Sequence, residues 1–544
     1  MTTTTGPSSS ASPYLVPVAD GYSTTSILTV GDTVGGYPMA GIADGLGAYD
    51  NGDGTFTILM NHELKAGQGA VHAHGATGSF ISKYVVKNDL TVVSGSDLIQ
   101  RVMVWDAATS TWSQQVVEVS RFCSSDLAPA GAYFDAATGA GSQELIYLTG
   151  EENGATGRAT ATVATGAEAG TTYVLPWMGQ MSFENMTTLP DTGSKTIVAL
   201  TDDSNGGEVY FYVGDKKTTG NAVERAGLTG GNLYGLSIAG VADETDATDV
   251  GAGATFTLVE IPNAAAITGD ELEAVSASLG VSSMARPEDS AWNPANQNGL
   301  YFTTTASFKG ISRMWHLQFI DVAGNPAAGG VATVAAQSPA YDAALADAQQ
   351  GGPRMMDNMT VNADGTVYIQ EDPGNNPYLS GVWRLDPATG SLERILQHDP
   401  ARFGEGVAGA LTNDEESSGI IPVPFLGEGK YLLDVQAHYP LDATLVEGGQ
   451  LLLLDVAAEQ PTPTPTATPT ETATVEPTAT AEPTVAPTES ATAAPVATST
   501  PKPGASAPLA NTGAEGLFAL VSGAAAALVL GGATWIISRS RGDA

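Results

Sequence analysis

Polar, mostly acidic clusters recur along the chain, each directly after a short β-branched or aromatic run. There are six: Asn61-His62-Glu63, Glu151-Glu152-Asn153, Asp202-Asp203, Arg286-Pro287-Glu288-Asp289, Gln370-Glu371-Asp372 and Asp434-Val435-Gln436. Carboxylates that converge from different elements bind hard cations such as calcium, and bridging carboxylates also suit a pair of iron ions. Each cluster alone is equally typical of an acidic surface turn. The run of six therefore predicts a metal site if the fold brings the clusters together.

Cys123 is the only cysteine of the chain and lies in Arg121-Phe122-Cys123-Ser124. It cannot form a disulfide within its own chain, so it is inert, an intermolecular partner or a metal ligand. A thiolate is a soft ligand suited to iron or zinc. A buried, unreactive thiol is the commoner fate of a free cysteine. The local sequence leaves both interpretations open.

Arg286 stands beside two acids, Glu288 and Asp289. An arginine held among metal-binding acids is a suitable clamp for phosphate oxygens, and a structural ion pair is the alternative. His62 and His438 are equally compatible with general-base and structural roles. The chain has no Gly-x-Ser-x-Gly at a convincing strand-to-helix turn and no phosphate-binding Gly-Lys loop. Serine-hydrolase chemistry and nucleotide hydrolysis by that route are therefore not expected.

The elements that must position these residues are mostly short strands separated by Gly, Asn, Asp and Pro. Strands are expected at Thr55–Met60, Glu144–Thr149, Thr196–Leu200, Glu208–Val213, Leu300–Thr304, Trp315–Ile320, Thr366–Gln370, Gly381–Leu385 and Gln450–Asp455. Hairpin turns are expected at Asn362–Gly365 and Asp386–Gly390. Helices are expected only at Gly269–Leu279 and Pro339–Gln350.

The spacing of the six clusters is close to the length of one four-stranded blade with its loops. Radial blades bring equivalent strand ends to one central channel, whereas a β-sandwich would scatter them over two ends. The sequence therefore predicts an all-β fold, a six-bladed β-propeller with the clusters around its axis.

Composition limits the class of partner. The chain of 544 residues has a formal net charge of −38 and is 42% hydrophobic, so it can bury a large core. Binding to a nucleic-acid backbone needs a basic face, which excludes nucleic acid as an expected partner. Excess carboxylate suits calcium binding or simple solubility at a cell surface.

Four regions follow one another along the chain. Residues 1–20 are expected to be a flexible N-terminus and residues 21–458 the folded part. Residues 459–508 are almost wholly Pro, Thr, Ala, Val, Glu and Ser, which predicts a disordered, semi-rigid stalk. Residues 509–544 contain an uncharged apolar run at 517–537, long enough to cross a bilayer as a helix.

The order of features at the C-terminus resembles a sortase wall-sorting signal of the LAxTG type. The pentapeptide Leu509-Ala510-Asn511-Thr512-Gly513 precedes the apolar run, and Arg539 and Arg541 follow it. The resemblance implies cleavage between Thr512 and Gly513, sortase and peptidoglycan as partners, and a membrane-spanning precursor. The expected location is extracellular, on the cell wall. The N-terminus shows no secretion signal, which indicates a processed chain or a start assigned too far downstream.

The folded part resembles the PhoX-type alkaline phosphatase family over about residues 35 to 455. Short motifs in matching order carry the resemblance: Asn61-His62-Glu63, Arg121-Phe122-Cys123-Ser124, Gly150-Glu151-Glu152-Asn153, Phe183-Glu184-Asn185, Arg286-Pro287-Glu288-Asp289, Asp357-Asn358, Gln370-Glu371-Asp372 and Glu416-Ser417-Ser418-Gly419. The resemblance implies a six-bladed propeller that holds two ferric ions and calcium ions, and the hydrolysis of phosphate esters outside the cytoplasm.

Site residues follow from the same resemblance. Cys123, Glu184 and Glu288 would bind iron, and Arg286 would bind substrate phosphate. The remaining acids of the metal cluster, shared with calcium, would be Glu63, Glu151, Asp289, Asp357 and Glu371.

The sequence departs from the family pattern between Asp126 and Thr149, a stretch without tryptophan, and Gly150 stands where the family has a second cysteine. This loop would reshape one rim of the site. The alternative function is therefore a calcium-stabilised propeller that binds a ligand or surface partner without catalysis. A monomer is expected in either case.

Overall fold

The computed structural model describes residues 1–457. The predicted stalk at 459–508 and the predicted sorting signal at 509–544, with its cleavage site at Thr512 and Gly513, lie outside the described residues. Within residues 1–457, no helix has the length and apolar character needed to cross a membrane.

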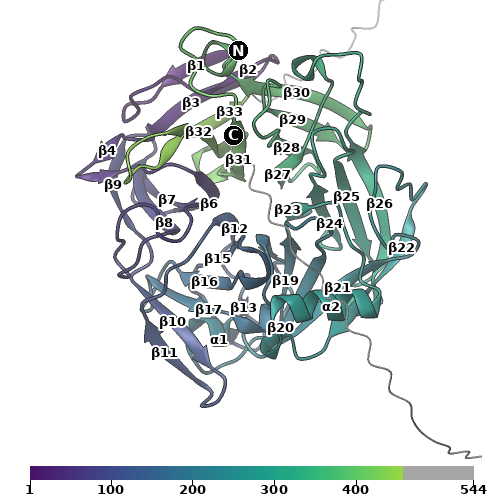
Figure 1. Cartoon of the computed structure of the whole chain (residues 1–544). Helices are drawn as coiled ribbons and strands as arrows, with labels where there is room; N and C mark the ends of the chain where they lie inside the picture. The colour runs from purple at the N-terminus through teal and green to yellow at the C-terminus, as the bar shows by residue number, and fades with distance from the viewer. Residues whose placement is uncertain (458–544) are drawn as a thin grey trace, which may run out of the picture. The chain divides into compact units, whose positions relative to one another are not determined.

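The described part is built from sheets that Figure 1 shows arranged around a central axis. The first sheet contains β6 (Ala43–Asp50), β7 (Thr55–His62), β8 (Phe80–Lys87) and β9 (Val92–Asp97). The second contains β12 (Phe122–Leu127), β15 (Ile146–Glu151), β16 (Ala159–Val163), β17 (Thr171–Val174), β10 (Arg101–Asp106) and β11 (Thr111–Gln115).

The third sheet has nine strands and joins two radial sets through the β22–β26 pairing. One set comprises β18 (Phe183–Thr188), β19 (Lys195–Asp202), β20 (Val209–Asp215), β21 (Asn232–Ile238) and β22 (Ala254–Ile261). The other comprises β23 (Pro287–Trp292), β24 (Gly299–Thr304), β25 (Arg313–Phe319) and β26 (Gly330–Gln337).

Two five-stranded sheets complete the circle. One contains β27 (Met356–Val361), β28 (Val367–Glu371), β29 (Gly381–Asp386), β30 (Ser391–His398) and β2 (Leu15–Pro17). The other contains β31 (Glu415–Pro422), β32 (Lys430–Pro440), β33 (Glu447–Val456), β3 (Tyr22–Thr29) and β1 (Thr2–Thr5). Small additions are β4 (Thr33–Val34), β5 (Tyr37–Pro38), β13 (Phe134–Asp135), β14 (Ala140–Gly141), α1 (Ala222–Arg225), α2 (Gly269–Leu279) and α3 (Pro400–Phe403).

Six innermost strands contact one another in a closed ring, in the order β6, β12, β18, β23, β27, β31 and back to β6. Each of them has a β-bulge near its start, in the intervals Ala43/Leu46, Phe122/Ser125, Phe183/Met186, Pro287/Ser290, Met356/Met359 and Ser417/Ile420. A bulge leaves a residue unpaired and re-aims its side chain. The fold therefore repeats one local distortion six times around its axis.

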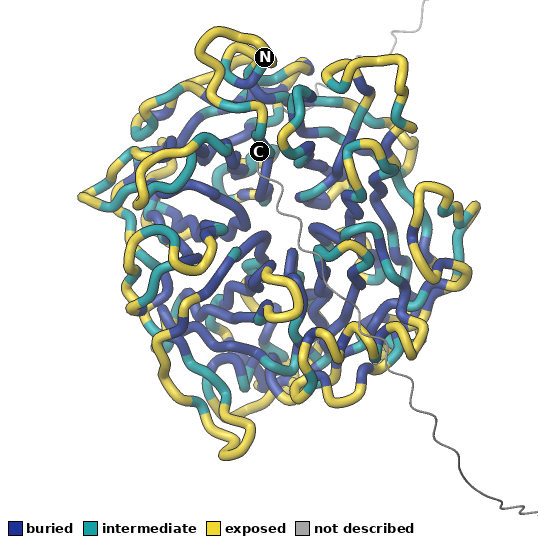
Figure 2. The backbone as a smooth tube through the Cα atoms, viewed as in Figure 1, coloured by how far each residue is buried: buried dark blue, intermediate teal, exposed yellow. Residues whose placement is uncertain are grey.

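Apolar side chains fill the space between neighbouring sheets. One core cluster joins Phe56 of β7 to Leu432 of β32 and Leu453 of β33, and another is built around Trp315 of β25. Burying one such side chain contributes about 1.5–3 kcal/mol, so these contacts hold the ring closed. Figure 2 shows the strands buried near the axis and the connecting loops exposed.

The N-terminal residues differ from the prediction of a flexible segment. β1 pairs in parallel with β3, and β2 pairs with β30 of the neighbouring sheet. Tyr14 and Leu15 are buried, and the Tyr14 backbone N–H donates to Gln450 Oε1 at 2.6 Å. Residues 1–20 are therefore ordered, because they supply edge strands to the last two sheets.

Strands overlap every segment where the sequence predicted one, and both predicted hairpins and the helix at Gly269–Leu279 are confirmed. The predicted helix at Pro339–Gln350 is wrong, because only Asp347–Gln349 forms a short 3₁₀ turn there. Carbonyl groups of this segment accept hydrogen bonds from side chains instead: Arg354 Nη2 donates to Pro339 O at 3.0 Å, and Gln350 Nε2 donates to Asp342 O at 2.8 Å.

Candidate metal centre

The six bulges place one side chain each at equivalent positions around the axis. The residue directly after the last paired residue before each bulge is Asp44, Cys123, Glu184, Glu288, Asp357 or Ser418. Four carboxylates and one thiol thus share a single structural position, and a hydroxyl takes the sixth. The repeated bulge explains why residues far apart in sequence meet.

A second set of side chains comes from the strands that pair with the inner ones. Each follows directly after the residue that pairs with the last inner-strand residue before the bulge: Glu63, Glu152, Asp203, Thr305, Asp372 and Gln436. Gln436 Nε2 donates to Asp44 Oδ2 at 2.9 Å and to Glu63 Oε2 at 3.2 Å, which joins the two sets.

Members of the two sets, together with Glu416 of β31, form four linked groups in which the possible ligand atoms lie within 4.8 Å of one another. The groups are Asp44–Glu63–Cys123, Cys123–Glu152–Glu184, Glu184–Glu288–Asp357 and Asp357–Asp372–Glu416. Cys123, Glu184 and Asp357 each belong to two groups, so the donors form one continuous arc. Such an arrangement suits a cluster of several ions with bridging carboxylates.

The donors fit iron and calcium in their chemistry. One thiolate among carboxylates suits iron, and the oxygen-only groups suit calcium. Glu184 Oε1 is buried and has no hydrogen-bond partner among the described residues. A buried carboxylate oxygen without a donor is costly unless it is protonated or bound to a cation.

Electrostatics support the same conclusion. Burial, followed by the charges of Asp357 and Asp44, raises the pKa of Glu184 well above its usual value. Burial and then Asp44 raise the pKa of the Cys123 thiol, and burial and then Glu416 raise the pKa of Asp372 to about 7. Crowded anions of this kind repel one another unless cations neutralise them.

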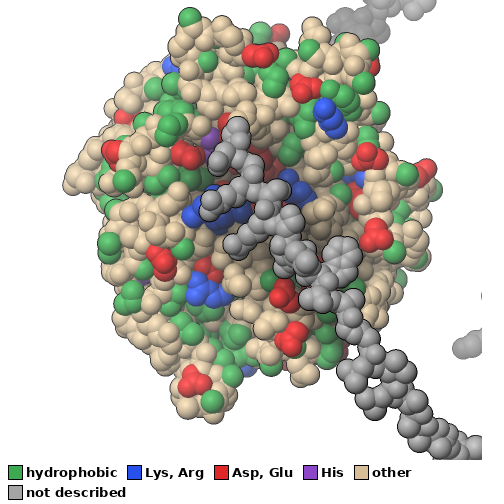
Figure 3. Space-filling view, viewed as in Figure 1, with side chains coloured by type: hydrophobic (Ala, Val, Ile, Leu, Met, Phe, Trp, Pro, Cys, Tyr) green, Lys and Arg blue, Asp and Glu red, His purple; other side chains and the backbone are tan. Residues whose placement is uncertain are grey.

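Two arginines contact different acids in and beside the arc. Arg286 donates from Nε and Nη2 to Asp203 at 2.8 and 2.7 Å, and Nη2 lies 3.3 Å from Glu288 Oε1. Arg121 donates from Nε to Glu63 at 2.7 Å and also pairs with Glu152. Their side chains are 33% and 35% exposed, whereas their acidic partners are nearly buried. Figure 3 shows basic side chains around the hollow at the centre of this face.

The arginines occupy equivalent positions, each directly before an inner strand. Both have left-handed backbone conformations, with φ of 52° at Arg121 and 61° at Arg286. Non-glycine residues adopt this region at a cost, and such strain is concentrated at functional sites. Ile42 and Met355 precede β6 and β27 with similar φ values of 51° and 48°. The left-handed conformation therefore accompanies the bulge in four of the six inner strands. At two of these four positions the residue is an arginine.

His438 lies at the end of the arc, between two glutamates. Its Nδ1 lies 2.6 Å from Glu447, and its Nε2 lies 4.0 Å from Glu416. Although burial opposes protonation, these two glutamates raise the pKa of His438 to about 11. This position favours an ion-pairing role over that of a general base.

The structure brings together five of the predicted metal ligands: Glu63, Cys123, Glu184, Glu288 and Asp357. It does not bring Glu151, Asp289 or Glu371 into the four groups. Glu151 pairs with Arg158, Glu371 accepts from Tyr378 and the Arg354 backbone, and Asp289 accepts from Asn185 and the Met359 backbone. Their roles as ligands stay predictions, and these contacts indicate that they support the bulged strands.

Sequence reasoning missed Asp44, Glu152, Asp372 and Glu416 as ligands. Glu152 and Asp372 directly follow Glu151 and Glu371, the acids that the sequence predicted as ligands. Neighbouring side chains on a strand point to opposite sides, so only one acid of each pair faces the arc. Asp44 lies in a glycine-rich stretch that gave no clear strand signal. A pattern search for one acid in each inner strand would have found it.

A fifth acidic group, Asp202–Glu208–Glu273, lies outside the arc. Burial and then Glu273 raise the pKa of Glu208 to about 9. Burial, partly opposed by hydrogen bonds from Ser204 and Ser182, raises the pKa of Asp202 to about 7. In the folded protein these acids therefore retain protons that the unfolded chain has lost.

This group gives a pH prediction. Stability from a carboxyl whose folded-state pKa is raised is present below the unfolded pKa and is lost as pH rises through the folded one. With chelator present, the free energy of unfolding should fall between about pH 5 and 9, and Glu208→Gln should flatten that fall. Urea unfolding across this range measures both slopes, with Glu393→Gln on the exposed surface as control. Equal slopes for wild type and Glu208→Gln would contradict the assignment.

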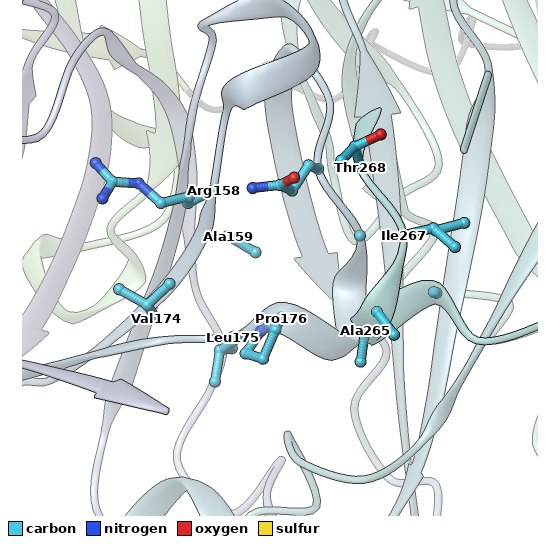
Figure 4. A pocket seen from close by; sticks show the side chains of 12 residues that line it. Arg158, Ala159, Val174, Leu175, Pro176, Ala265, Ile267 and Thr268 are labelled. Atoms are coloured by element: carbon cyan, nitrogen blue, oxygen red, sulfur yellow. The ribbon is translucent and has the colours of Figure 1, made fainter. Parts of the chain in front are cut away.

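A pocket of about 310 Å³ opens between β16, β17 and the segment 264–268. Figure 4 shows its lining, in which Arg158 is the only ionisable side chain. The pocket contains no member of the four metal-ligand groups. The pocket therefore offers none of the possible metal ligands that the arc brings together.

The comparisons with known proteins agree with the geometry. Residues 167–402 match the family model described as alkaline phosphatase PhoX. This range contains Glu184, Arg286, Glu288, Asp357 and Asp372. No curated protein sequence matches the chain.

The fold is that of a solved PhoX. The structure of Pseudomonas fluorescens PhoX in complex with vanadate, a transition state analogue, has a TM-score of 0.59 at 14% identity, covering 82% of this chain and 96% of that one. The structure of Chaetomium thermophilum Sqt1 bound to the N-terminus of the ribosomal protein L10 has a TM-score of 0.35 at 12% identity, covering 79% of this chain and 99% of that one. This score is too low to indicate a shared fold. Over residues 167–402 the chain thus has the sequence pattern of alkaline phosphatase PhoX, on a fold that a PhoX protein shares.

Proposed function

We propose that this protein is a phosphatase that hydrolyses phosphate esters at a cluster of iron and calcium ions on the axis of a six-bladed β-propeller. The observation that most strongly supports this function is the continuous arc of acids and one thiol, with two arginines beside it. The match to the PhoX family model and the PhoX fold support phosphoric ester hydrolase activity. The closed ring of six inner strands supports the number of blades.

The ligand set divides by donor type. Cys123, Glu184 and Glu288 would hold iron, together with Glu152 and Asp44. Asp357, Asp372 and Glu416 offer only oxygen and would hold calcium. Ions bound there would supply positive charge to the oxygens of a phosphate ester and to an attacking oxygen nucleophile.

The chain's own residues position the substrate. Arg286 is held by two hydrogen bonds to Asp203, so its guanidinium is oriented before substrate arrives. A planar guanidinium binds two phosphate oxygens at once, and fixed donors stabilise charge that develops in the transition state. Arg121 provides a second guanidinium, held by Glu63 and Glu152. The acidic partners of both arginines are largely buried, and charges interact more strongly where the surroundings are shielded from water.

We also propose that the enzyme acts outside the cell, anchored to the wall. The support is the C-terminal sequence order: the Pro/Thr-rich stretch, the LAxTG-type pentapeptide, the apolar run and the basic tail. Intact cells that carry the protein should therefore hydrolyse a phosphate ester that does not cross the membrane. Activity that appears only after lysis would contradict this location.

The catalytic proposal is tested on the purified full-length chain. We expect both iron and calcium by mass spectrometry, hydrolysis of p-nitrophenyl phosphate, and inhibition by vanadate. Chelation should abolish the activity and lower the melting temperature, because the uncompensated acids then repel one another. Calcium without iron, and no hydrolysis, would instead favour the non-catalytic binding propeller.

A further inference from the structure

Three of the left-handed residues before the inner strands are preceded by the same contact. In each case the residue one position earlier donates its backbone N–H to a buried glutamate: Ser120 to Glu151 at 2.9 Å, Arg354 to Glu371 at 2.6 Å, and Ala285 to Glu244 at 3.0 Å. The left-handed residues that follow these donors are Arg121, Met355 and Arg286. A buried carboxylate therefore anchors the turn into three of the six inner strands.

Glu244 reaches this position from a different part of the chain. Glu151 and Glu371 each lie opposite the last residue before the bulge in their own radial sets. In the set of β23 that position holds Thr304, which has no carboxylate. Glu244 comes instead from the connection between β21 and β22, and the Thr304 hydroxyl donates to its Oε1 at 3.1 Å. A residue of the neighbouring set thus supplies the carboxylate that the set of β23 lacks.

Four donors hold the Glu244 carboxylate in place. Its Oε1 accepts hydrogen bonds from three side chains: Arg313 Nη1 at 2.9 Å, Trp315 Nε1 at 3.1 Å and Thr304 Oγ1 at 3.1 Å. Its Oε2 accepts from the Ala285 N–H. The side chains of Glu244 and Arg313 are 0% and 1% exposed. Hydrogen bonds to an ionised acceptor are stronger than those between neutral groups, so the Ala285 peptide is bound to a fixed point.

The peptide groups on either side of Arg286 are bound as well. The Ala285 carbonyl oxygen accepts from the Ala306 N–H at 2.8 Å, and the Arg286 carbonyl oxygen accepts from the Thr305 N–H at 3.0 Å. A non-glycine residue keeps the costly φ of 61° only where its surroundings impose it. The backbone is thus held at the residue whose guanidinium pairs with Asp203.

We propose that Glu244 is a positioning residue for Arg286. It holds the peptide before Arg286, so that the guanidinium can bind phosphate without a change of the backbone. Glu244 belongs to none of the four ligand groups and acts through Arg286. The inference rests on the proposed function, in which Arg286 binds the substrate phosphate. Outer partners that orient metal ligands are worth about 10–100-fold, and misplacing a reacting group by about 1 Å costs a similar factor.

Glu244→Gln changes the contact with Ala285 specifically. A glutamine amide offers an oxygen acceptor on one side and an NH2 donor on the other. Three donors converge on the Oε1 side, so the amide oxygen takes that side and the NH2 group faces the Ala285 N–H. Two donors then oppose each other, and the peptide before Arg286 must move. Thr304→Val is the matched control, because it removes another donor to the same carboxylate and leaves the Ala285 contact intact.

The test is the hydrolysis of p-nitrophenyl phosphate by the full-length chain. We expect Glu244→Gln to lower kcat/KM by about 10-fold or more, with iron and calcium content unchanged. In the Arg286→Gln background the same substitution should change kcat/KM by less than about twofold, because its effect passes through Arg286. Thr304→Val should keep the wild-type kcat/KM even where it lowers the melting temperature. Equal losses in both backgrounds, or unchanged kinetics in Glu244→Gln, would overturn the proposal.

Failure of this inference is distinguishable from failure of the proposed function. A wild-type chain that neither hydrolyses the ester nor binds vanadate contradicts the proposed function and overturns the inference as well. An active wild type with an equally active Glu244→Gln contradicts the inference alone. If Glu244→Gln does not fold, a crystal structure of the wild type with vanadate decides. It should show Arg286 on the vanadate and the Ala285 N–H on Glu244. Vanadate without contact to Arg286, or Glu244 turned away from Ala285, would overturn the proposal.

Discussion

Cys123→Ser is expected to remove iron from the protein and to lower phosphatase activity by roughly 100-fold or more, since even outer partners of metal ligands cost 10–100-fold. Cys123 belongs to two of the four ligand groups and is the only sulfur donor among them. A serine hydroxyl is nearly the same size and can still contact Asp44, whose Oδ2 lies 3.5 Å from Sγ. The fold should therefore survive while the affinity for iron is lost.

Iron content by mass spectrometry and visible absorption from ferric–thiolate charge transfer measure this effect without reference to activity. Ser125→Ala is the matched control on the same strand, because it removes the 2.5 Å hydrogen bond to Tyr147 and leaves the ligand groups intact. It should cost stability but no iron per folded chain. Full iron content in Cys123→Ser would show that the thiol is a structural residue, and the iron assignment would fail.

Local signals in the sequence were sufficient for the strands and turns. Asn362–Gly365 and Asp386–Gly390 contain the glycines that take the positive φ of a hairpin, 85° at Gly365 and 73° at Gly390. The helix at Gly269–Leu279 has a capping box at Thr268 and Glu271. The segment Pro339–Gln350 has neither signal, only a composition that suits a helix, and there side-chain hydrogen bonds decide the conformation.

The residues of the site could not be predicted from local sequence signals alone, because the β-bulges and the strand pairing decide which side chains join the arc. A bulge inserts one residue into the inner strand, and on the unbulged strand that pairs with it, alternation turns only one of two neighbouring acids toward the arc. This is why Glu152 and Asp372 join the arc while Glu151 and Glu371 do not. Cys123, Glu184, Glu288 and Asp357, which the family resemblance indicated through whole motifs, lie within the bulges and belong to the four groups.

The repeated bulge also explains why successive residues of each motif take different positions and make different contacts. In Arg286-Pro287-Glu288-Asp289, the first residue takes the left-handed conformation, the third joins the arc and the fourth braces the next strand. Arg121-Phe122-Cys123-Ser124 follows the same order, with Ser124 accepting from Asn185 at 2.8 Å. One backbone geometry therefore fixes the position of the arginine, the position of the arc residue and a supporting position at once.

Arg286→Gln is expected to lower kcat/KM for a phosphate monoester by about 10²–10³-fold, the usual cost of losing one fixed donor to the transition state. Arg286→Lys should recover little, because lysine keeps the charge but not the two-pronged geometry held by Asp203. Arg121→Gln should have a similar but smaller effect, and inhibition by inorganic phosphate should weaken in both variants.

Arg158→Gln is the control for the arginine variants, because Arg158 is likewise part-exposed and paired with a buried glutamate, yet lies outside the ligand groups. It should leave kcat/KM within about twofold, since surface charges away from the reacting groups contribute little. If both arginines bind the same phosphate, the double variant should lose less than the product of the single effects, since each substitution removes part of one shared interaction. Full additivity would mean that the two arginines act on separate sites, and unchanged kinetics in Arg286→Gln would remove it from the mechanism.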